Sequence, residues 1–116
     1  MAQIKHLLVL AIVLCGHLVF SQKDRYMVFF SDKEGVSFSI DQPEAFLSER
    51  AISRRSRMGI AITEKDLPVN TTYVAGVRST GAQVYYTSRW FNAALVQMTS
   101  DELIQVTQLA YVDSVE

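Results

Sequence analysis

Residues 90–116, WFNAALVQMTSDELIQVTQLAYVDSVE, carry the clearest secondary-structure signals of the sequence. Its first part, residues 91–98, predicts a strand, because small and apolar side chains alternate along it. Residues 100–109 then predict a short helix, and residues 111–115 predict a second strand. A strand, a helix and a strand this close together form one split βαβ half, the unit from which ferredoxin-like domains are built.

The start of this helix is marked by its capping residues. Thr99 and Glu102 have the T-x-x-E spacing of a capping box, in which each side chain bonds a backbone N–H at the helix start. Asp101 adds negative charge near the positive end of the helix dipole. The apolar stripe at helical spacing is Leu103, Val106 and Leu109.

The first predicted strand has two distinct faces. One face, expected to join the core, carries Ala94, Val96 and Met98, and the other carries Ala93, Leu95 and Gln97. In the last strand, Val112 or Val115 is expected to join the same core. They are three residues apart, so a regular strand would not point both toward it.

The N-terminal part of the domain predicts a strand, a turn and a return strand. Residues 25–30 alternate with apolar side chains on both faces, which suits a strand covered on two sides or one that keeps a face for a partner. Residues 32–35 (DKEG) predict a turn, and residues 36–40 predict a short strand that completes a hairpin.

An extra helix is expected over residues 41–58. Asp41 and Glu44 have capping-box spacing, Pro43 is tolerated in the first turn, and Gly59 is expected to end the helix. Its expected buried side is Phe46, Leu47, Ala51, Ile52 and Met58. Its arginines are Arg50, Arg54, Arg55 and Arg57. They indicate either an anion-binding patch or a solvated face near the helix C-terminus, and the acidic composition of the domain favours the solvated face.

The remaining elements complete the predicted fold. Asn70 is expected to cap a helix that runs to about Thr80, with Gly81 as its stop. Residues 82–88 predict a strand with Val84 and Tyr86 on one face and Tyr85 on the other. The sequence therefore predicts one α+β domain, a ferredoxin-like antiparallel sheet packed on helices, with an extra helix after the first strand or hairpin.

Residues 1–21 are expected to be a cleavable signal peptide. Lys5 precedes an apolar run over residues 7–20, and Val19 and Ser21 occupy the −3 and −1 positions before Gln22. A buried N-terminal helix or a short anchor is the alternative, and Cys15 lacks the small preceding residues of a lipoprotein signal. The sequence therefore predicts a secreted or periplasmic domain, residues 22–116, with no stable membrane anchor after cleavage.

Removal of the signal would limit the chemistry of the domain. Both histidines, His6 and His17, and the single cysteine lie within it. The remaining domain would carry net charge −2 and could hold no Ser-His-Asp triad, cysteine nucleophile or His/Cys zinc site. The carboxylate pairs Glu64/Asp66 and Asp101/Glu102 have simpler roles in a connector and a helix start. We therefore expect no enzyme activity, no metal or other cofactor, and no nucleic-acid partner.

A binding role fits the expected sheet better. If helices cover one face, Ala93, Leu95 and Gln97 lie on the other, where Phe91 and Tyr85 would extend an apolar docking surface. Alternatively, the extra helix or the hairpin covers this second face, and periodicity alone does not decide between the two.

Several motifs resemble a known family. The pattern of the C-terminal stretch resembles the N-terminal prodomain, or peptidase inhibitor I9-like domain, of subtilisin-like (S8 family) serine peptidases. The run AFLSERAISRRSRMGI, with DLPVN and SRWFNA after it, is similar to secreted bacterial members. The matching C-terminal residues are Phe91, Asn92, Ala93, Ala94, Thr99, Glu102, Leu103, Leu109, Val112, Val115 and Glu116, although the family often has Gly at Ala93 and an aromatic residue at Ala94.

The resemblance implies a partner and a role. Prodomains of this family pack a sheet face on the catalytic domain, assist its folding and place a C-terminal tail in the substrate cleft by strand addition. The implied protein-binding residues are Phe91, Ala93, Leu95, Gln97, Tyr111, Asp113, Val115 and Glu116. Since the sequence ends at Glu116, the chain is interpreted as a fragment of a longer precursor. The alternative is a free-standing secreted binding module or peptidase inhibitor.

Overall fold

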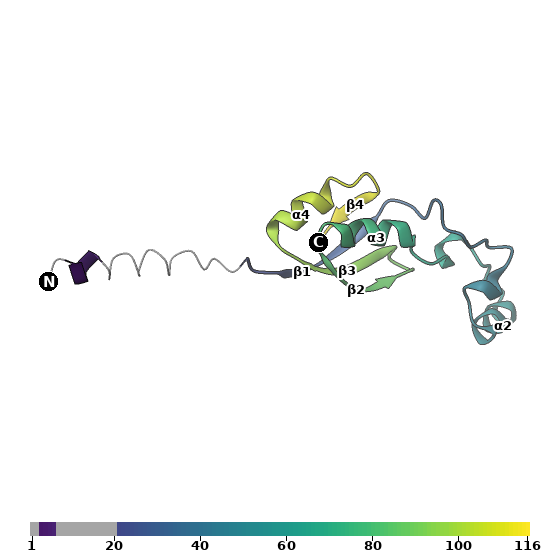
Figure 1. Ribbon diagram of the computed structural model, residues 1–116. Helices are drawn as coiled ribbons and strands as arrows, with labels where there is room; N and C mark the ends of the chain where they lie inside the picture. Colours follow the sequence, from purple (N-terminus) through teal and green to yellow (C-terminus); the bar gives the residue numbers. More distant parts are fainter. Residues whose placement is uncertain (1–2, 7–20) are drawn as a thin grey trace.

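The computed structural model describes residues 3–6 and 21–116, and its centre is a four-stranded antiparallel sheet (Figure 1). The strands are β1 (Asp24–Phe30), β2 (Gln83–Ser88), β3 (Ala93–Met98) and β4 (Val112–Val115). Their order across the sheet is β2-β3-β1-β4, and every neighbouring pair is antiparallel. This order results from two interleaved split βαβ halves, so the predicted ferredoxin-like α+β fold is confirmed.

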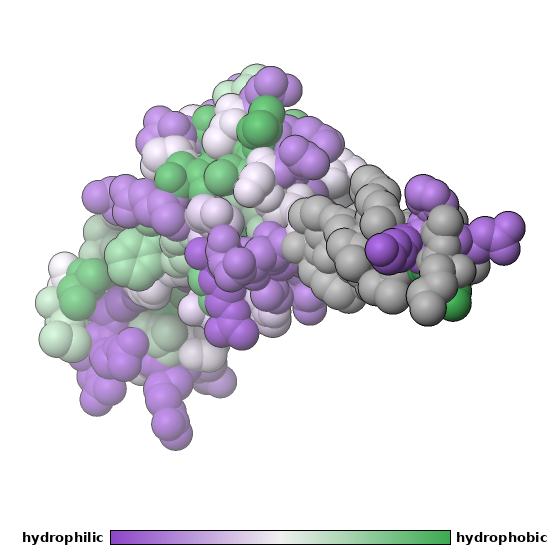
Figure 2. Space-filling model, turned by 90° about the vertical axis from the view of Figure 1, so that its left-hand side faces the viewer, coloured by the Kyte–Doolittle hydropathy of each residue, from purple (hydrophilic) through white to green (hydrophobic). Residues whose placement is uncertain are grey.

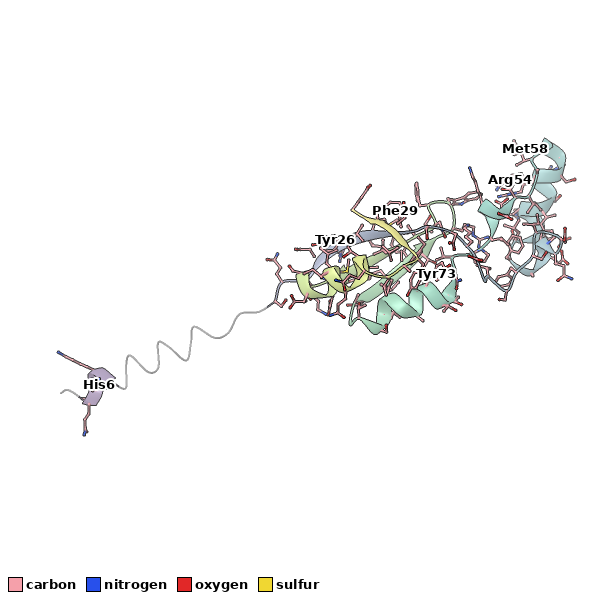
Figure 3. The ribbon with its side chains drawn as sticks, turned by 90° about the horizontal axis from the view of Figure 1, so that it is seen from above. His6, Tyr26, Phe29, Arg54, Met58 and Tyr73 are labelled. Atoms are coloured by element: carbon pink, nitrogen blue, oxygen red, sulfur yellow. The ribbon has the colours of Figure 1, made fainter. Side chains whose placement is uncertain are left out.

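Two helices, α3 (Thr71–Ser79) and α4 (Ser100–Thr107), lie side by side on one face of the sheet (Figures 1 and 3). The buried core between helices and sheet consists of Val28, Phe30, Val69, Val74, Val77, Ala82, Ala94, Val96, Met98 and Val106. Ala94, Val96 and Met98 are fully buried, which confirms the core face predicted for this strand.

Local side-chain caps start both helices as the sequence predicts. The backbone N–H of Glu102 donates to Thr99 Oγ1 over 3.2 Å, and the N–H of Thr99 donates to Glu102 Oε2 over 2.8 Å. The Asn70 side chain accepts from the N–H of Thr72 over 2.8 Å at the start of α3. These bonds satisfy backbone groups that have no partner within the helix.

A β-bulge in β4 brings both of its valines to the core. Val115 lies opposite Val28 and Val112 lies opposite Phe30, with the register shifting between them. Residues opposite one another in a sheet share a face, so both valines pack against the core despite their spacing of three. A regular strand would have placed only one of them there.

A second bulge, in β2, corrects the faces predicted for that strand. Val84 lies opposite Val96 on the helix side, but Tyr86 lies opposite Leu95, with the register shifting between Val84 and Tyr86. Tyr86 therefore lies on the sheet face away from the helices and not with Val84. The prediction was wrong because it assumed unbroken alternation.

The segment after β1 differs most from the prediction. Residues 36–40 form no strand, so the expected hairpin is absent from the described chain. The single helix expected over residues 41–58 is instead a 3-10 turn, Pro43–Ala45, and the helix α2, Glu49–Met58. Asp41 is not the cap. Ser48 caps α2 by accepting from the N–H of Ala51 over 3.2 Å.

The expected buried side of this helix is only partly formed. No residue of α2 is fully buried, and Met58 is 67% exposed, against the prediction. The other four residues expected on that side are half-buried: Phe46, Leu47, Ala51 and Ile52. Figures 1 and 3 show why, because α2 lies at the far end of the molecule, beyond the sheet. Gly59 does end the helix as predicted, in the left-handed conformation at φ +66°.

Most of the expected signal peptide, residues 1–21, lies outside the described residues, which include only residues 3–6 and Ser21 of it. Among the described residues, no helix has the length and apolar character needed to cross a membrane.

Candidate functional site

The sheet face opposite α3 and α4 is the candidate docking surface, and we call it the open face. Its side chains are Met27 and Phe29 on β1, Leu95 and Gln97 on β3, and Tyr85 and Tyr86 on β2. Both tyrosines are exposed and the other four residues are half-buried. Neither α2 nor the segment before it covers this face in the described part of the chain, since both lie beyond the end of the sheet (Figure 3).

Polar contacts order one end of the open face. The Arg25 guanidinium lies 5.1 Å from the centre of the Tyr85 ring, and Tyr85 Oη donates to Gln97 Oε1 over 2.5 Å. Gln97 Nε2 donates in turn to the carbonyl of Lys23 over 3.3 Å. Aromatic rings held in one orientation give a surface that loses little side-chain entropy when a partner binds.

The four residues predicted at this face occupy different environments. Leu95 and Gln97 lie together on the open face, whereas Ala93 is fully buried between its cross-strand neighbours Phe29 and Ser88. Phe91 is 67% exposed but lies in the turn between β2 and β3, outside the strand predicted to hold it. Leu95, Gln97 and Phe91 therefore present surface that a partner can contact, whereas the fully buried Ala93 presents none.

The four residues predicted around the last strand do not form one surface with the open face. The Tyr111 ring stacks on Tyr73 with 4.2 Å between ring centres, and Val115 packs against the core, so both lie on the helix side. Asp113 and Glu116 are exposed. The backbone of Glu116 bonds Met27 in both directions, over 2.7 and 3.0 Å, so β4 remains paired with β1 to the last residue.

A polar cluster holds the segment of α2 against the end of the sheet, and sequence reasoning missed it. Arg55 Nη1 lies 2.6 Å from Asp66 Oδ2, and the two side chains are only 11% and 3% exposed. Asp66 is the last residue of the short 3-10 turn Glu64–Asp66, and its Oδ2 also accepts from the N–H of Thr63 over 2.9 Å. Burial acts to raise the pKa of Asp66, but the bonds from Thr63 and Arg55 outweigh it, and the pKa is lowered overall.

Lys33 and Arg89 complete this cluster. Lys33 Nζ donates to the carbonyls of Lys65, Leu67 and Arg89, and Arg89 donates to the carbonyls of Phe46 and Asp66 over 3.0 and 3.3 Å. Burial, with the charge of Arg89, lowers the pKa of Lys33. We call Lys33, Arg55, Asp66 and Arg89 the latch, because they join the α2 segment to the sheet.

Three of the latch residues lie in motifs recognised in the sequence, but sequence reasoning did not predict that these motifs meet in space. Arg55 comes from the run AFLSERAISRRSRMGI, Asp66 precedes Leu67 in DLPVN, and Arg89 belongs to SRWFNA. The three motifs that carry the family resemblance therefore meet at one place. The solvated-face interpretation of the arginines holds for Arg50, Arg54 and Arg57, which are exposed, but fails for Arg55.

One carboxylate of each pair considered for catalysis has a structural partner. Asp66 is buried against Arg55, and Glu102 closes the α4 capping box and lies 3.6 Å from Lys23 Nζ. Within residues 3–6 and 21–116, no three histidine, cysteine, aspartate or glutamate side chains gather as a metal site would require.

Comparison with known proteins places this geometry in a family. The sequence profile of the peptidase S8 propeptide domain of Bacteroidota matches residues 25–116, which span the sheet, the latch and α2. Neither the search of curated proteins nor the search of solved structures found a match. The match covers most of the chain and agrees with the resemblance carried by its motifs. The chain thus belongs to the peptidase S8 propeptide domain family, as an N-terminal prodomain of an S8 peptidase.

Proposed function

We propose that this chain binds an S8 catalytic domain through its open face, assists the folding of that domain and inhibits it. The observation that carries the proposal is an uncovered sheet face in a propeptide domain. It carries five large apolar or aromatic side chains, which are Met27, Phe29, Tyr85, Tyr86 and Leu95. Such a face favours a protein partner because association would remove its apolar surface from water. A propeptide domain alone is not a catalytic domain, so we expect no hydrolysis by the chain itself.

The last strand extends the proposed contact. β4 pairs with β1 on one side, and the backbone pairing reaches Glu116. Residues that followed Glu116 in a longer precursor would leave from this edge of the sheet and could add to the partner as an extended strand. Asp113 and Glu116, both exposed, are the proposed contacts here.

The proposal is tested by binding to S8 catalytic domains encoded by the same genome, each with its nucleophilic serine replaced by alanine. Any such domain that continues the reading frame after Glu116 is tested first. We expect the wild-type chain to bind one of them, and Leu95→Glu and Tyr86→Glu to weaken binding by about tenfold or more, as for residues at the centre of an interface. Ile104→Glu is the matched control, since Ile104 is 56% exposed on α4, on the opposite side of the sheet.

Inhibition and folding assistance are measured with the active catalytic domain. We expect the chain to slow peptide hydrolysis and to raise the yield of active enzyme after dilution from denaturant. If the chain binds none of these catalytic domains, or if Leu95→Glu and Tyr86→Glu bind as tightly as Ile104→Glu, the open face has no such role. A free-standing binding module would then be the better interpretation.

We also propose that residues 1–21 direct export and are removed before Gln22, in keeping with the exported proteases to which Bacteroidota S8 propeptides belong. Mass spectrometry of the exported chain should find Gln22 as its first residue. Ser21→Leu should block cleavage, because signal peptidase requires a small residue at −1. Export with an intact N-terminus in the wild type would favour an anchor instead.

A further inference from the structure

We propose that the chain has a second docking surface on α2 and the β2–β3 turn, and that it binds an acidic surface with an apolar centre on the same S8 catalytic domain. We call this surface the arm, and its residues are Arg50, Arg54, Arg57, Met58, Ile60, Trp90 and Phe91. The inference rests on the proposed function, since it extends the contact beyond the open face.

The arm does not contribute to the core of its own domain. α2 has ten residues, none of them buried, and it packs mainly on the 3-10 turn Pro43–Ala45. Met58 and the nearby Ile60 are 67% and 50% exposed. Helices shorter than about 12–15 residues are marginal in water without tertiary packing, so α2 gains little stability by itself.

The latch nevertheless holds this helix in one position. Arg55 extends from α2 to the buried carboxylate of Asp66, and Arg89 bonds the carbonyl of Phe46 in the segment that leads to α2. Burying such charges is costly unless each is paired and hydrogen-bonded. A helix that is anchored by buried charges, yet adds nothing to the core, is suited to presenting a surface to a partner.

The arm also continues toward the open face. Trp90 and Phe91 are exposed in the turn that joins β2 to β3, the two strands that carry Tyr86 and Leu95. The Arg55 guanidinium lies 5.4 Å from the centre of the Trp90 ring, so Trp90 bridges this turn to α2. Exposed aromatic residues such as Trp90 and Phe91 are enriched at protein interfaces. Figure 2 views the molecule from the opposite end, where β1 begins, and shows that hydrophobic surface is also exposed there in several places between hydrophilic side chains.

The charge of the arm indicates what kind of partner surface would bind it. Arg50, Arg54 and Arg57 are exposed on α2, and Glu49 is the only acidic residue of that helix. Figure 3 shows Arg54 and Met58 together on α2, so positive and apolar groups share this part of the molecule. The chain as a whole has net charge −1, and Asp41 and Glu44 are exposed in and before the turn on which α2 packs. The positive charge is therefore confined to the face of α2 that carries the three arginines, which recur at helical spacing. An acidic rim around an apolar centre on the partner would complement this surface, and charge complementarity speeds association and fixes orientation.

The experiment uses the purified chain and the serine-to-alanine S8 catalytic domains described above. Met58→Glu is compared with Ile104→Glu, and the double variant Arg54→Glu/Arg57→Glu is compared with Arg78→Glu, an exposed arginine on α3. We expect each arm variant to weaken binding by about tenfold, and each control by less than about twofold. The loss in the arginine variant should shrink at about 0.5 M salt, because exposed charges are then screened.

Each remaining outcome decides against the inference in a different way. If the wild type and the arm variants bind alike while Leu95→Glu and Tyr86→Glu bind weakly, the arm is not an interface but the proposed function stands. If the wild type binds no S8 catalytic domain, the proposed function fails and the inference with it. If the arginine variant binds the peptidase normally but loses affinity for a DNA or RNA oligonucleotide, the basic face serves nucleic acid. Circular dichroism of every variant must match the wild type. This is expected for the arm variants, the controls and Tyr86→Glu, whose substituted side chains are exposed, and Tyr86→Glu alone represents the open face if Leu95→Glu, at a half-buried position, does not fold.

Discussion

At the scale of single residues, Asp66 links the charge state of the protein to the attachment of the arm. The bonds from Thr63 and Arg55 hold its pKa below the ordinary value, against the opposing effect of burial. The ionised form is therefore favoured more in the folded than in the unfolded chain. Its contribution to stability is fully present above the unfolded pKa of about 3.9 and is lost as pH falls through the lower folded pKa.

We expect the free energy of unfolding to fall between about pH 5 and about pH 2, and part of that fall to vanish in Asp66→Asn. Urea titrations at several pH values measure it. Asp32 provides a control, since its pKa is also lowered, first by the bond that it accepts from Tyr73 Oη over 2.6 Å. Tyr73→Phe should remove only the part of this fall that comes from Asp32. If the free energy of unfolding of Asp66→Asn falls with pH as steeply as that of the wild type, Asp66 does not contribute to the fall.

Among the secondary-structure elements, those whose determinants are local were predicted well. The α4 capping box joins Thr99 and Glu102, three residues apart, and α4 and β3 were predicted within about two residues of their ends. α2 was not, because sequence reasoning assigned the cap to Asp41/Glu44, whereas the turn there has no side-chain cap bond and Ser48 caps the helix. The latch was missed because Arg55, Asp66 and Arg89 are far apart in the chain.

The packing of α3 on the last strand depends on Gly76. A Cβ placed there would overlap the Tyr111 hydroxyl and lie 3.0 Å from Tyr111 Cζ, while Tyr111 stacks on Tyr73. We expect Gly76→Ala to cost about 1–3 kcal/mol of unfolding free energy through overpacking, despite the better helix propensity of alanine. In a Tyr111→Phe background the same substitution should cost much less, because the overlapping oxygen is gone. Thermal unfolding of the four proteins measures this, and equal costs in both backgrounds would rule out the clash as the cause.

For the whole molecule, stability is expected to be uneven. The central strands β1 and β3 lie between other strands and carry much of the buried core, whereas α2 has no buried residue and depends on the latch. Elements with few buried contacts open at lower free energy than the global unfolding transition. The domain should therefore behave as a cooperative sheet-and-helix body with an attached helix that opens first.

Hydrogen exchange tests this division and the role of the latch together. Amides of β1 and β3 should exchange slowest and those of α2 fastest, because α2 can open without exposing the core. Arg55→Met leaves the Asp66 carboxylate buried without its ion-pair partner. Breaking a fully buried pair in this way costs about 3–5 kcal/mol, and we expect this cost to destabilise the attachment of α2. We expect faster exchange in α2 and in Glu64–Asp66, with β3 little changed. If exchange in β3 accelerates equally, the latch belongs to the cooperative core, and the arm is held as an integral part of the fold.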